Sequence, residues 1–86
     1  MYQLYILRCA DKTLYTGITV DLIRRIKEHN TSNLGAKYTR ARRPVKLINA
    51  KKFRNQSLAA KAESKVKKLS RQEKLFLIKN NFKLKN

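Results

Sequence analysis

The stretch Tyr2-Gln-Leu-Tyr-Ile-Leu-Arg8, followed closely by Thr13-Leu-Tyr-Thr-Gly-Ile-Thr19, determines how this chain begins to fold. In both segments aromatic and β-branched residues alternate with polar ones, which is typical of β-strands. Ala10-Asp-Lys12 between them supplies a turn, so the two segments are predicted to form a β-hairpin. Gly17, inside the second strand, indicates a bulge or a close approach of another group to the backbone.

A helix and a third strand are predicted after the hairpin. Thr19 or Asp21 is placed to cap the helix. Helical spacing gives its inner side as Leu22, Ile23, Ile26 and Asn30. The polar and basic stretch 30–43 is predicted to be an exposed loop, which Pro44 closes. The third strand is predicted over residues 45–53, with one face carrying Val45, Leu47 and Asn49.

Two more helices are predicted in the last third of the chain. Ser57 caps the first of them, and its buried stripe is expected to be Leu58, Ala62, Val66 and Leu69. Ser70-Arg-Gln-Glu73 is a capping box that begins a short final helix. The order β-β-α-β-α-α predicts an α/β fold in which helices flank a small three-stranded antiparallel sheet. We expect one domain over residues 1–80 and a basic C-terminal tail over residues 81–86.

The charge of the chain is its strongest compositional feature. Twenty-two Lys and Arg residues stand against five Asp and Glu residues, which gives a net charge of +17 on 86 residues. Such a charge favours a polyanionic partner, and nucleic acid is the first candidate. A membrane surface is disfavoured, because the basic helices carry few large aromatic residues for interfacial insertion.

Composition also argues against several classes of protein. The N-terminal apolar run is too short and too early interrupted for a signal peptide, and no apolar run approaches membrane-spanning length. The single cysteine, Cys9, excludes an internal disulfide and fits a reducing cytoplasm. One cysteine and one histidine together argue against a closed Cys/His zinc site within the chain.

Glu63 is the acidic residue that lacks a ready structural explanation. The other four fit a turn, a helix cap, a surface ion pair with Arg24 or Arg25, and a capping box: Asp11, Asp21, Glu28 and Glu73. A lone carboxylate in a strongly positive protein is what a metal-dependent phosphodiesterase requires, and Mg²⁺ usually takes few carboxylates. The alternative is a local ion pair between Glu63 and Lys67, one helical turn later.

Four further side chains are candidates for phosphodiester chemistry. Tyr5 and Tyr15 share a face of the hairpin if its loop has three residues, and lie on opposite faces if it has two. Arg25 and His29 share a helix face. Arg25 could clamp a phosphate, and Tyr15 could accept a proton if positive charge eases ionisation of a phenol, while His29 could share that work. The alternatives are packing for the tyrosines, solvation for Arg25 and dipole stabilisation for His29.

The ordered motifs resemble one known family. Leu4-Tyr5-Ile6 and Tyr15-Thr16-Gly17 resemble the paired motif of the GIY-YIG nuclease superfamily, and residues 21–29 resemble its helix. Residues 35–40 and 62–69 resemble its short single-domain bacterial members. The resemblance implies a three-stranded antiparallel sheet with flanking helices, and Mg²⁺- or Mn²⁺-dependent cleavage of DNA strands.

The resemblance also implies roles for particular residues. Tyr15 takes the position of the general base, Tyr5 of its partner at the phosphate or the attacking water, and Arg25 of the transition-state clamp. His29 is an accessory polar group, and Glu63 is the metal ligand. Gly17 takes the position of the glycine that lets the backbone approach nucleic acid. The chain departs from the family pattern at Gln3, Leu4, Thr16 and Ile18.

Nucleic acid is predicted to contact the basic segment 37–43. Its cations are expected to follow phosphates: Lys37, Arg40, Arg42 and Arg43. Tyr38 either stacks on an unpaired base or packs back against the sheet, and Lys67 extends the basic surface. Target choice would come from this surface, from a homodimer or from a targeting partner protein. The expected function is a cytoplasmic DNA endonuclease, with DNA repair or recombination as its setting. The alternatives are an inactive nucleic-acid-binding module and an RNA- or ribosome-associated protein.

Overall fold

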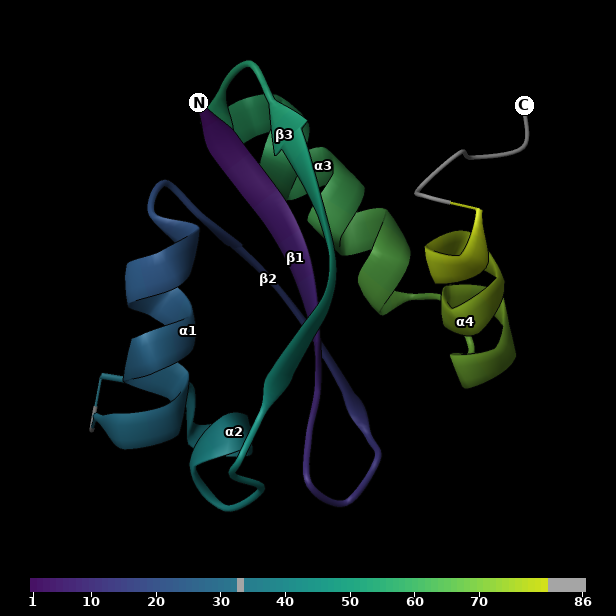
Figure 1. The fold of residues 1–86 in the computed structure, drawn as a ribbon. Helices are drawn as coiled ribbons and strands as arrows, with labels where there is room; N and C mark the ends of the chain where they lie inside the picture. Colours follow the sequence, from purple (N-terminus) through teal and green to yellow (C-terminus); the bar gives the residue numbers. More distant parts are fainter. Residues whose placement is uncertain (33, 81–86) are drawn as a thin grey trace.

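The hairpin at the start of the chain supplies the central strand of the sheet and one of its edge strands (Figure 1). The computed structural model describes residues 1–32 and 34–80. In it, β1 (Tyr2–Arg8) pairs antiparallel with β2 (Leu14–Thr19) along one edge and with β3 (Lys46–Phe53) along the other. The strand order is therefore β2-β1-β3, and the predicted three-stranded antiparallel sheet is confirmed. The predicted basic tail, 81–86, lies outside the described residues.

The loop of the hairpin has three residues and fixes the register of the two strands. Cys9 N–H donates to the Thr13 carbonyl at 2.9 Å, and Lys12 between them has φ 68°, in the left-handed region. Asp11 Oδ1 accepts hydrogen bonds from the Thr13 amide at 3.1 Å and from its hydroxyl at 2.6 Å, which confirms the predicted turn. Tyr5 consequently pairs with Gly17, and Tyr15 pairs with Leu7, which lies two positions after Tyr5. The two tyrosines share a face.

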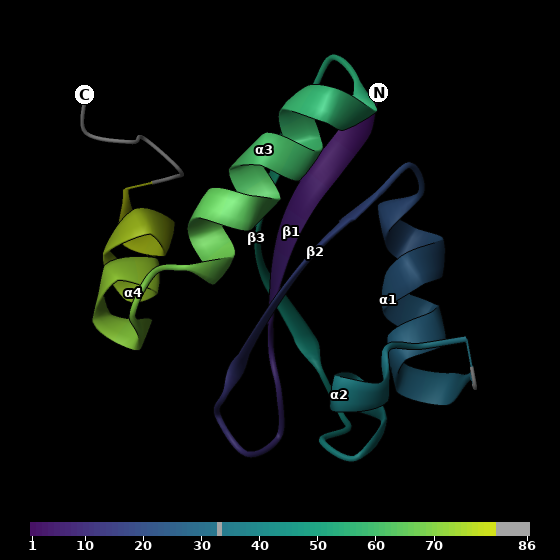
Figure 2. The ribbon, with the colours of Figure 1, turned by 180° about the vertical axis from the view of Figure 1, so that it is seen from behind.

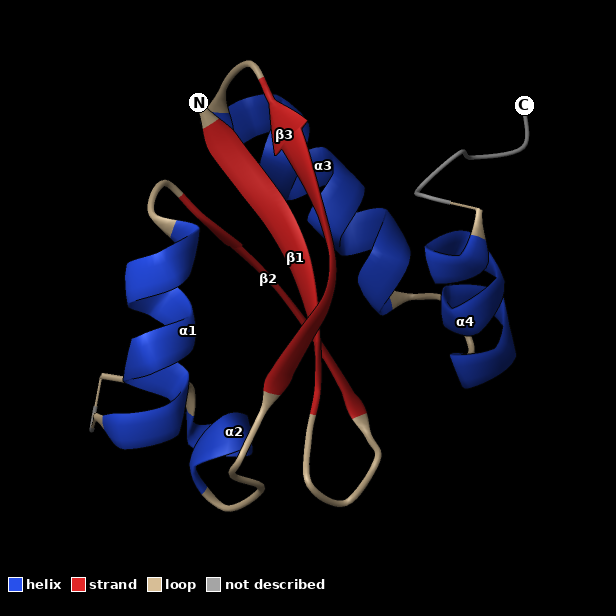
Figure 3. Ribbon diagram, in the orientation of Figure 1, coloured by secondary structure: helices blue, strands red, loops and turns tan. Residues whose placement is uncertain are grey.

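Helices cover both faces of the sheet (Figures 2 and 3). On the face of Tyr5 lie α1 (Leu22–Thr31) and the short α2 (Lys37–Arg40), and on the other lie α3 (Gln56–Lys67) and α4 (Arg71–Lys79). Alternate residues of β1 enter two separate clusters, one centred on Leu4, Ile6, Val66 and Leu77, the other on Tyr5, Leu7, Cys9 and Val45. In the described residues, no helix is long and apolar enough to cross a membrane.

The helix caps confirm part of the prediction and correct part of it. Asp21 caps α1 by accepting from the Arg24 amide at 3.1 Å, and Ser70 with Glu73 forms the predicted capping box. The cap of α3 is Asn55 rather than Ser57, and its Oδ1 accepts from the Leu58 amide. Ala62, Val66 and Leu69 of the predicted stripe pack in the core, whereas Leu58 is 45% exposed and Ala59 is buried in its place.

Two predictions about side-chain direction are wrong. Ile23 is 83% exposed. The inner side of α1 is formed by other positions of the helix, which include the buried His29. In β3 the register shifts so that Ile6 pairs with Asn49 and the next residue of β1 pairs with Leu47. Asn49 therefore does not share a face with Leu47, and its Nδ2 donates to the Ile78 carbonyl of α4 at 3.1 Å.

The segment predicted as an exposed loop is largely folded. It contains α2, whose Thr39 is fully buried, and Gly35, which packs so closely that an added Cβ would lie 2.7 Å from the Glu28 carbonyl oxygen. Arg43 closes the end of α1: its Nε donates to the His29 carbonyl and its Nη2 to the carbonyls of Glu28 and Ser32. These contacts add hydrogen bonds to carbonyls at the end of the helix, where the last carbonyls have no partners within the helix.

Candidate active site

A buried chain of hydrogen bonds joins three elements at the centre of the site. The Tyr5 hydroxyl from β1 lies 2.8 Å from His29 Nε2 on α1, and His29 Nδ1 lies 2.8 Å from the Thr39 hydroxyl on α2. Thr39 in turn donates to the Ala36 carbonyl at 2.9 Å in one arrangement of the protons. Both neutral tautomers of His29 give each ring nitrogen a partner. The ring is therefore held in one orientation between Tyr5 and Thr39.

Burial keeps both members of the Tyr5–His29 pair neutral. Burial, followed by the charges of Arg25 and Arg43, lowers the pKa of His29 to about 4. Burial also raises the pKa of Tyr5 to about 12, although a hydrogen bond and the charge of Arg25 oppose the rise. His29 is thus a buried neutral ring, and not a cation stabilised by the helix dipole. Tyr5 holds its proton at neutral pH.

The buried His29 should make folding stability depend on pH. The unfolded chain protonates His29 below its ordinary pKa of 6.5, whereas the folded protein does so only near pH 4. Stability from this group is therefore complete above pH 6.5 and is lost as the pH falls from 6.5 towards 4. Urea unfolding across this window should show the decline, and His29→Gln should flatten it. A decline of equal steepness in His29→Gln would assign it to carboxyl groups.

Tyr15 lies beside this pair and is only half-buried. Its ring centroid is 5.3 Å from that of His29 in a T-shaped arrangement and 6.4 Å from that of Tyr5. Tyr38 stacks on Tyr15 with centroids 6.0 Å apart, and Arg42 lies over the Tyr38 ring at 3.9 Å. Tyr38 therefore packs against the sheet with 37% of its surface exposed, and its stacking on an unpaired base stays a prediction.

Arg25 is anchored next to Tyr5. Its Nη1 donates to Glu28 Oε1 at 2.9 Å and to the Leu34 carbonyl at 2.7 Å, and its side chain is 26% exposed. The alternative of one more solvated arginine is therefore wrong. Because Nη1 carries these contacts, the rest of the guanidinium fork can bind a phosphate oxygen. The predicted surface pairing of Glu28 with both neighbouring arginines is confirmed.

Glu63 is paired within its own helix. Lys67 Nζ lies 3.4 Å from Glu63 Oε2, and the Glu63 side chain is 22% exposed, so the alternative local ion pair is formed. The negative charge of Glu63 nevertheless acts on Tyr5, where it is one cause of the raised pKa. Within residues 1–32 and 34–80, no group of three or more His, Cys, Asp or Glu side chains could hold a metal ion. A single carboxylate fits Mg²⁺ or Mn²⁺ only with water completing the coordination.

Gly17 lies beneath the Tyr5 ring. An added Cβ would be 2.5 Å from the Tyr5 hydroxyl oxygen and 2.7 Å from Cζ, and Gly17 itself is buried. The close approach indicated by the sequence is therefore that of Tyr5, and contact between Gly17 and nucleic acid stays a prediction. The glycine is required for the tyrosine to reach His29.

Gly17→Ala should therefore destabilise the domain by about 1–3 kcal/mol, the usual cost of overpacking a well-packed core. The Tyr5 ring cannot move aside easily, because it is 1% exposed and hydrogen-bonded to His29. Urea unfolding of the variant measures the cost. In a Tyr5→Leu background the same substitution should cost less, since the two sites are coupled. An equal cost in both backgrounds would contradict this account.

The four cations predicted to contact nucleic acid in segment 37–43 fall into two groups. Lys37 and Arg40 are exposed on α2. Arg42 is held by Asp11 at 3.0 Å and by the Tyr38 carbonyl at 2.9 Å, and Arg43 closes α1, so both have structural roles that the sequence did not reveal.

Thr39 was also missed by sequence reasoning. A threonine between basic residues in an apparent loop gives no local sign that it will be buried, and its role depends entirely on the position of His29.

The chain resembles known proteins over nearly its whole length. Residues 1–76 match the family model described as the GIY-YIG catalytic domain. A UPF0213 protein from Syntrophus aciditrophicus is 54% identical over 77 residues, which cover 90% of this chain and 88% of that protein. One from Pediococcus pentosaceus is 50% identical over 86 residues, 99% of this chain and 90% of that protein. The solution NMR structure of a UPF0213 protein from Bacillus halodurans, 43% identical, superposes with a TM-score of 0.62 over 96% of this chain and 88% of that one.

Proposed function

The chain belongs to the GIY-YIG family of nucleases, and we propose that it is a divalent-metal-dependent endonuclease that hydrolyses phosphodiester bonds in DNA. The observation that supports this most strongly is the anchored cluster on one face of the sheet. Tyr5 and His29 form the buried part of this cluster, and Tyr15 lies beside them at the surface. Arg25 is fixed next to Tyr5. This combination offers a proton acceptor and a phosphate clamp in a rigid frame.

Each of these residues is proposed to have a different role in the reaction. Tyr15 first gives its own proton to solvent, and the resulting phenolate takes the proton from the water that attacks the phosphorus. The bond to the leaving oxygen breaks, and that oxygen takes up a proton from solvent. Arg25 binds a phosphate oxygen and stabilises the charge that grows on it in the transition state. Tyr5 keeps its proton because its pKa is about 12, so it positions groups by hydrogen bonding and does not act as the base. His29, held neutral by burial and oriented by Thr39, fixes Tyr5.

Glu63 would hold the cation. Its carboxylate is partly exposed and acts electrostatically on Tyr5, and Lys67 would have to move from its 3.4 Å contact. A bound Mg²⁺ or Mn²⁺ would supply positive charge to the phosphate. Once displaced, Lys67 would be available to a DNA phosphate, as would the exposed Lys37 and Arg40.

The cellular setting belongs to the same proposal. We place the protein in the cytoplasm, where the buried free thiol of Cys9 is stable. DNA repair or recombination is the proposed process. Target choice would rest on the basic surface, on self-association or on a partner protein.

Cleavage of a substrate panel tests the proposal. Labelled single-stranded, duplex, flapped and four-way DNA, with RNA of matching sequence, would be incubated with the protein in Mg²⁺, in Mn²⁺ and with chelator. We expect cleavage of at least one DNA that the chelator abolishes. Cleavage confined to RNA would contradict the choice of DNA.

The Glu63–Lys67 ion pair favours one alternative function, a nucleic-acid-binding module without catalytic activity. A lysine beside the single candidate metal ligand competes with a cation for the carboxylate. Tight binding to one substrate, with no cleavage in either metal, would support this alternative and contradict the endonuclease.

A further inference from the structure

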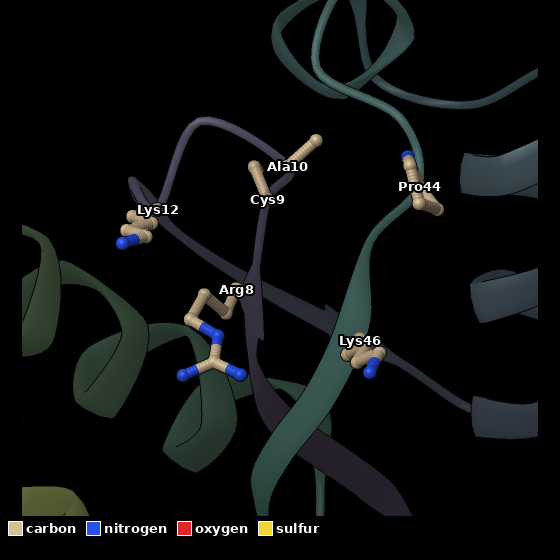
Figure 4. A pocket seen from close by; sticks show the side chains of 6 residues that line it. All are labelled: Arg8, Cys9, Ala10, Lys12, Pro44 and Lys46. Atoms are coloured by element: carbon tan, nitrogen blue, oxygen red, sulfur yellow. The ribbon is translucent and has the colours of Figure 1, made fainter.

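A second basic surface lies at the hairpin end of the sheet, on the face opposite Tyr5. Arg8 follows Tyr5 by three positions on β1, so its side chain leaves the other face, and its direct partner on β3 is Lys46. Figure 4 shows these two side chains and Lys12 around one hollow. The hollow has a volume of about 280 Å³, and Cys9, Ala10 and Pro44 complete its lining.

A neighbouring hollow continues this surface across the hairpin. It measures about 220 Å³ and is lined by Thr13, Leu14, Arg71 and Lys74. Arg71 Nη1 donates to the Lys12 carbonyl at 2.6 Å, which joins α4 to the hairpin loop. The two hollows together form what we call the hairpin groove, whose cations are Arg8, Lys12, Lys46, Arg71 and Lys74.

The positive charge of the hairpin groove is not neutralised within the described part of the chain. None of its five cations forms an ion pair there. Two carboxylates are adjacent in sequence to groove cations, and both are engaged elsewhere: Asp11 by Arg42 and Thr13, and Glu73 by the Ser70 amide. Like charges directly opposite one another on neighbouring strands are destabilising, and Arg8 and Lys46 are such a pair. An anion in the groove would remove that repulsion.

We propose that the hairpin groove binds the phosphate backbone of a nucleic-acid strand, on the face of the protein that does not carry the tyrosines. A strand fits better than a single phosphate because the cations come from β1, β3, α4 and the hairpin loop. Neighbouring strands of a sheet lie about 4.8 Å apart, and a nucleic-acid strand carries one charge about every 3.4 Å of helix axis. Several phosphates can therefore be contacted in succession. The proposal takes from the proposed function only that nucleic acid is the ligand.

Binding to labelled duplex DNA, measured by fluorescence anisotropy with chelator present, tests the groove without cleavage. Arg8→Ala/Lys46→Ala removes two charges from it, and Lys61→Ala/Lys65→Ala removes two exposed charges from α3. Between about 50 and 200 mM NaCl, the groove variant should lower the slope of log K against log salt by about 1.8, and its affinity should fall by about tenfold or more. The control should keep the wild-type slope and lose less than about threefold.

Three outcomes decide the matter. Equal losses in the two variants would show that only net charge counts, and would overturn the proposal. Displacement of the duplex by inorganic phosphate at constant ionic strength would reveal a single-anion pocket and would overturn the strand assignment. Preserved maximal cleavage with a raised KM in the groove variant would support a docking surface. If wild type binds but never cuts, the endonuclease fails, while the comparison of the two binding variants still decides on the groove.

Discussion

Tyr15→Phe should lower the rate of DNA strand cleavage by about 10²- to 10⁴-fold, the range expected for loss of a general base. The substitution removes one hydroxyl and keeps the ring, so the T-shaped contact with His29 and the stack on Tyr38 remain. The free energy of unfolding should consequently change little. Single-turnover cleavage at saturating protein measures the rate of the chemical step, and urea unfolding of the same preparations measures stability.

Tyr38→Phe is the matched control, because it removes the same group from the ring stacked on Tyr15. We expect its cleavage rate to stay close to that of wild type. Tyr5→Phe should lose activity through the broken hydrogen bond to His29, since Tyr5 positions other groups and keeps its own proton. Full activity in Tyr15→Phe, or equal losses in Tyr15→Phe and Tyr38→Phe, would refute the assignment of the base.

The sheet could be predicted from the sequence because its determinants are local. Alternation in the first two strands, with Asp11 in the turn, specifies a hairpin, and hydrogen bonds from Thr13 to Asp11 realise it. The length of the loop decided whether Tyr5 and Tyr15 meet. The three-residue loop requires Lys12 to adopt the left-handed conformation. A lysine in the sequence does not predict that conformation, because residues other than glycine rarely adopt it.

The errors lie where tertiary contacts override local patterns. Ile23 and Leu58 are apolar residues near the start of a helix, and both point outwards because other positions of each helix pack against the sheet. Arg43 and Thr39 looked like members of an exposed basic loop. Their partners, the carbonyl end of α1 and the ring of His29, lie ten or more positions away in the chain, so no local pattern could reveal them.

The site was only partly predictable for the same reason. The family resemblance brought the two tyrosines, Arg25 and His29 together, and the structure shows that they do lie together. For Glu63 the residues alone left two roles open, a metal ligand and an ion pair with Lys67, and the ion pair is present. The family resemblance implies the metal ligand, so substitution of this one carboxylate is the most informative experiment on the site.

Glu63→Gln should raise the Mg²⁺ concentration for half-maximal cleavage by at least about 10- to 100-fold, the range already seen when groups that merely support a metal ligand are removed. Glutamine keeps the size of the side chain but removes its negative charge, and a divalent cation requires that charge. The lost contact with Lys67 should cost only about 0.2–0.5 kcal/mol of stability. Mn²⁺ binding without DNA, followed by electron paramagnetic resonance, should weaken in parallel.

Glu73→Gln is the control for this substitution, because it removes the same charge from the neighbouring helix. Glutamine also serves in a capping box, so the contact with the Ser70 amide at 2.9 Å can persist. Its metal dependence should match that of wild type. If Glu63→Gln instead keeps wild-type Mn²⁺ binding and metal dependence, the carboxylate is not the ligand. Its pairing with Lys67 would then be its whole role, and any cation would have to be held by the substrate.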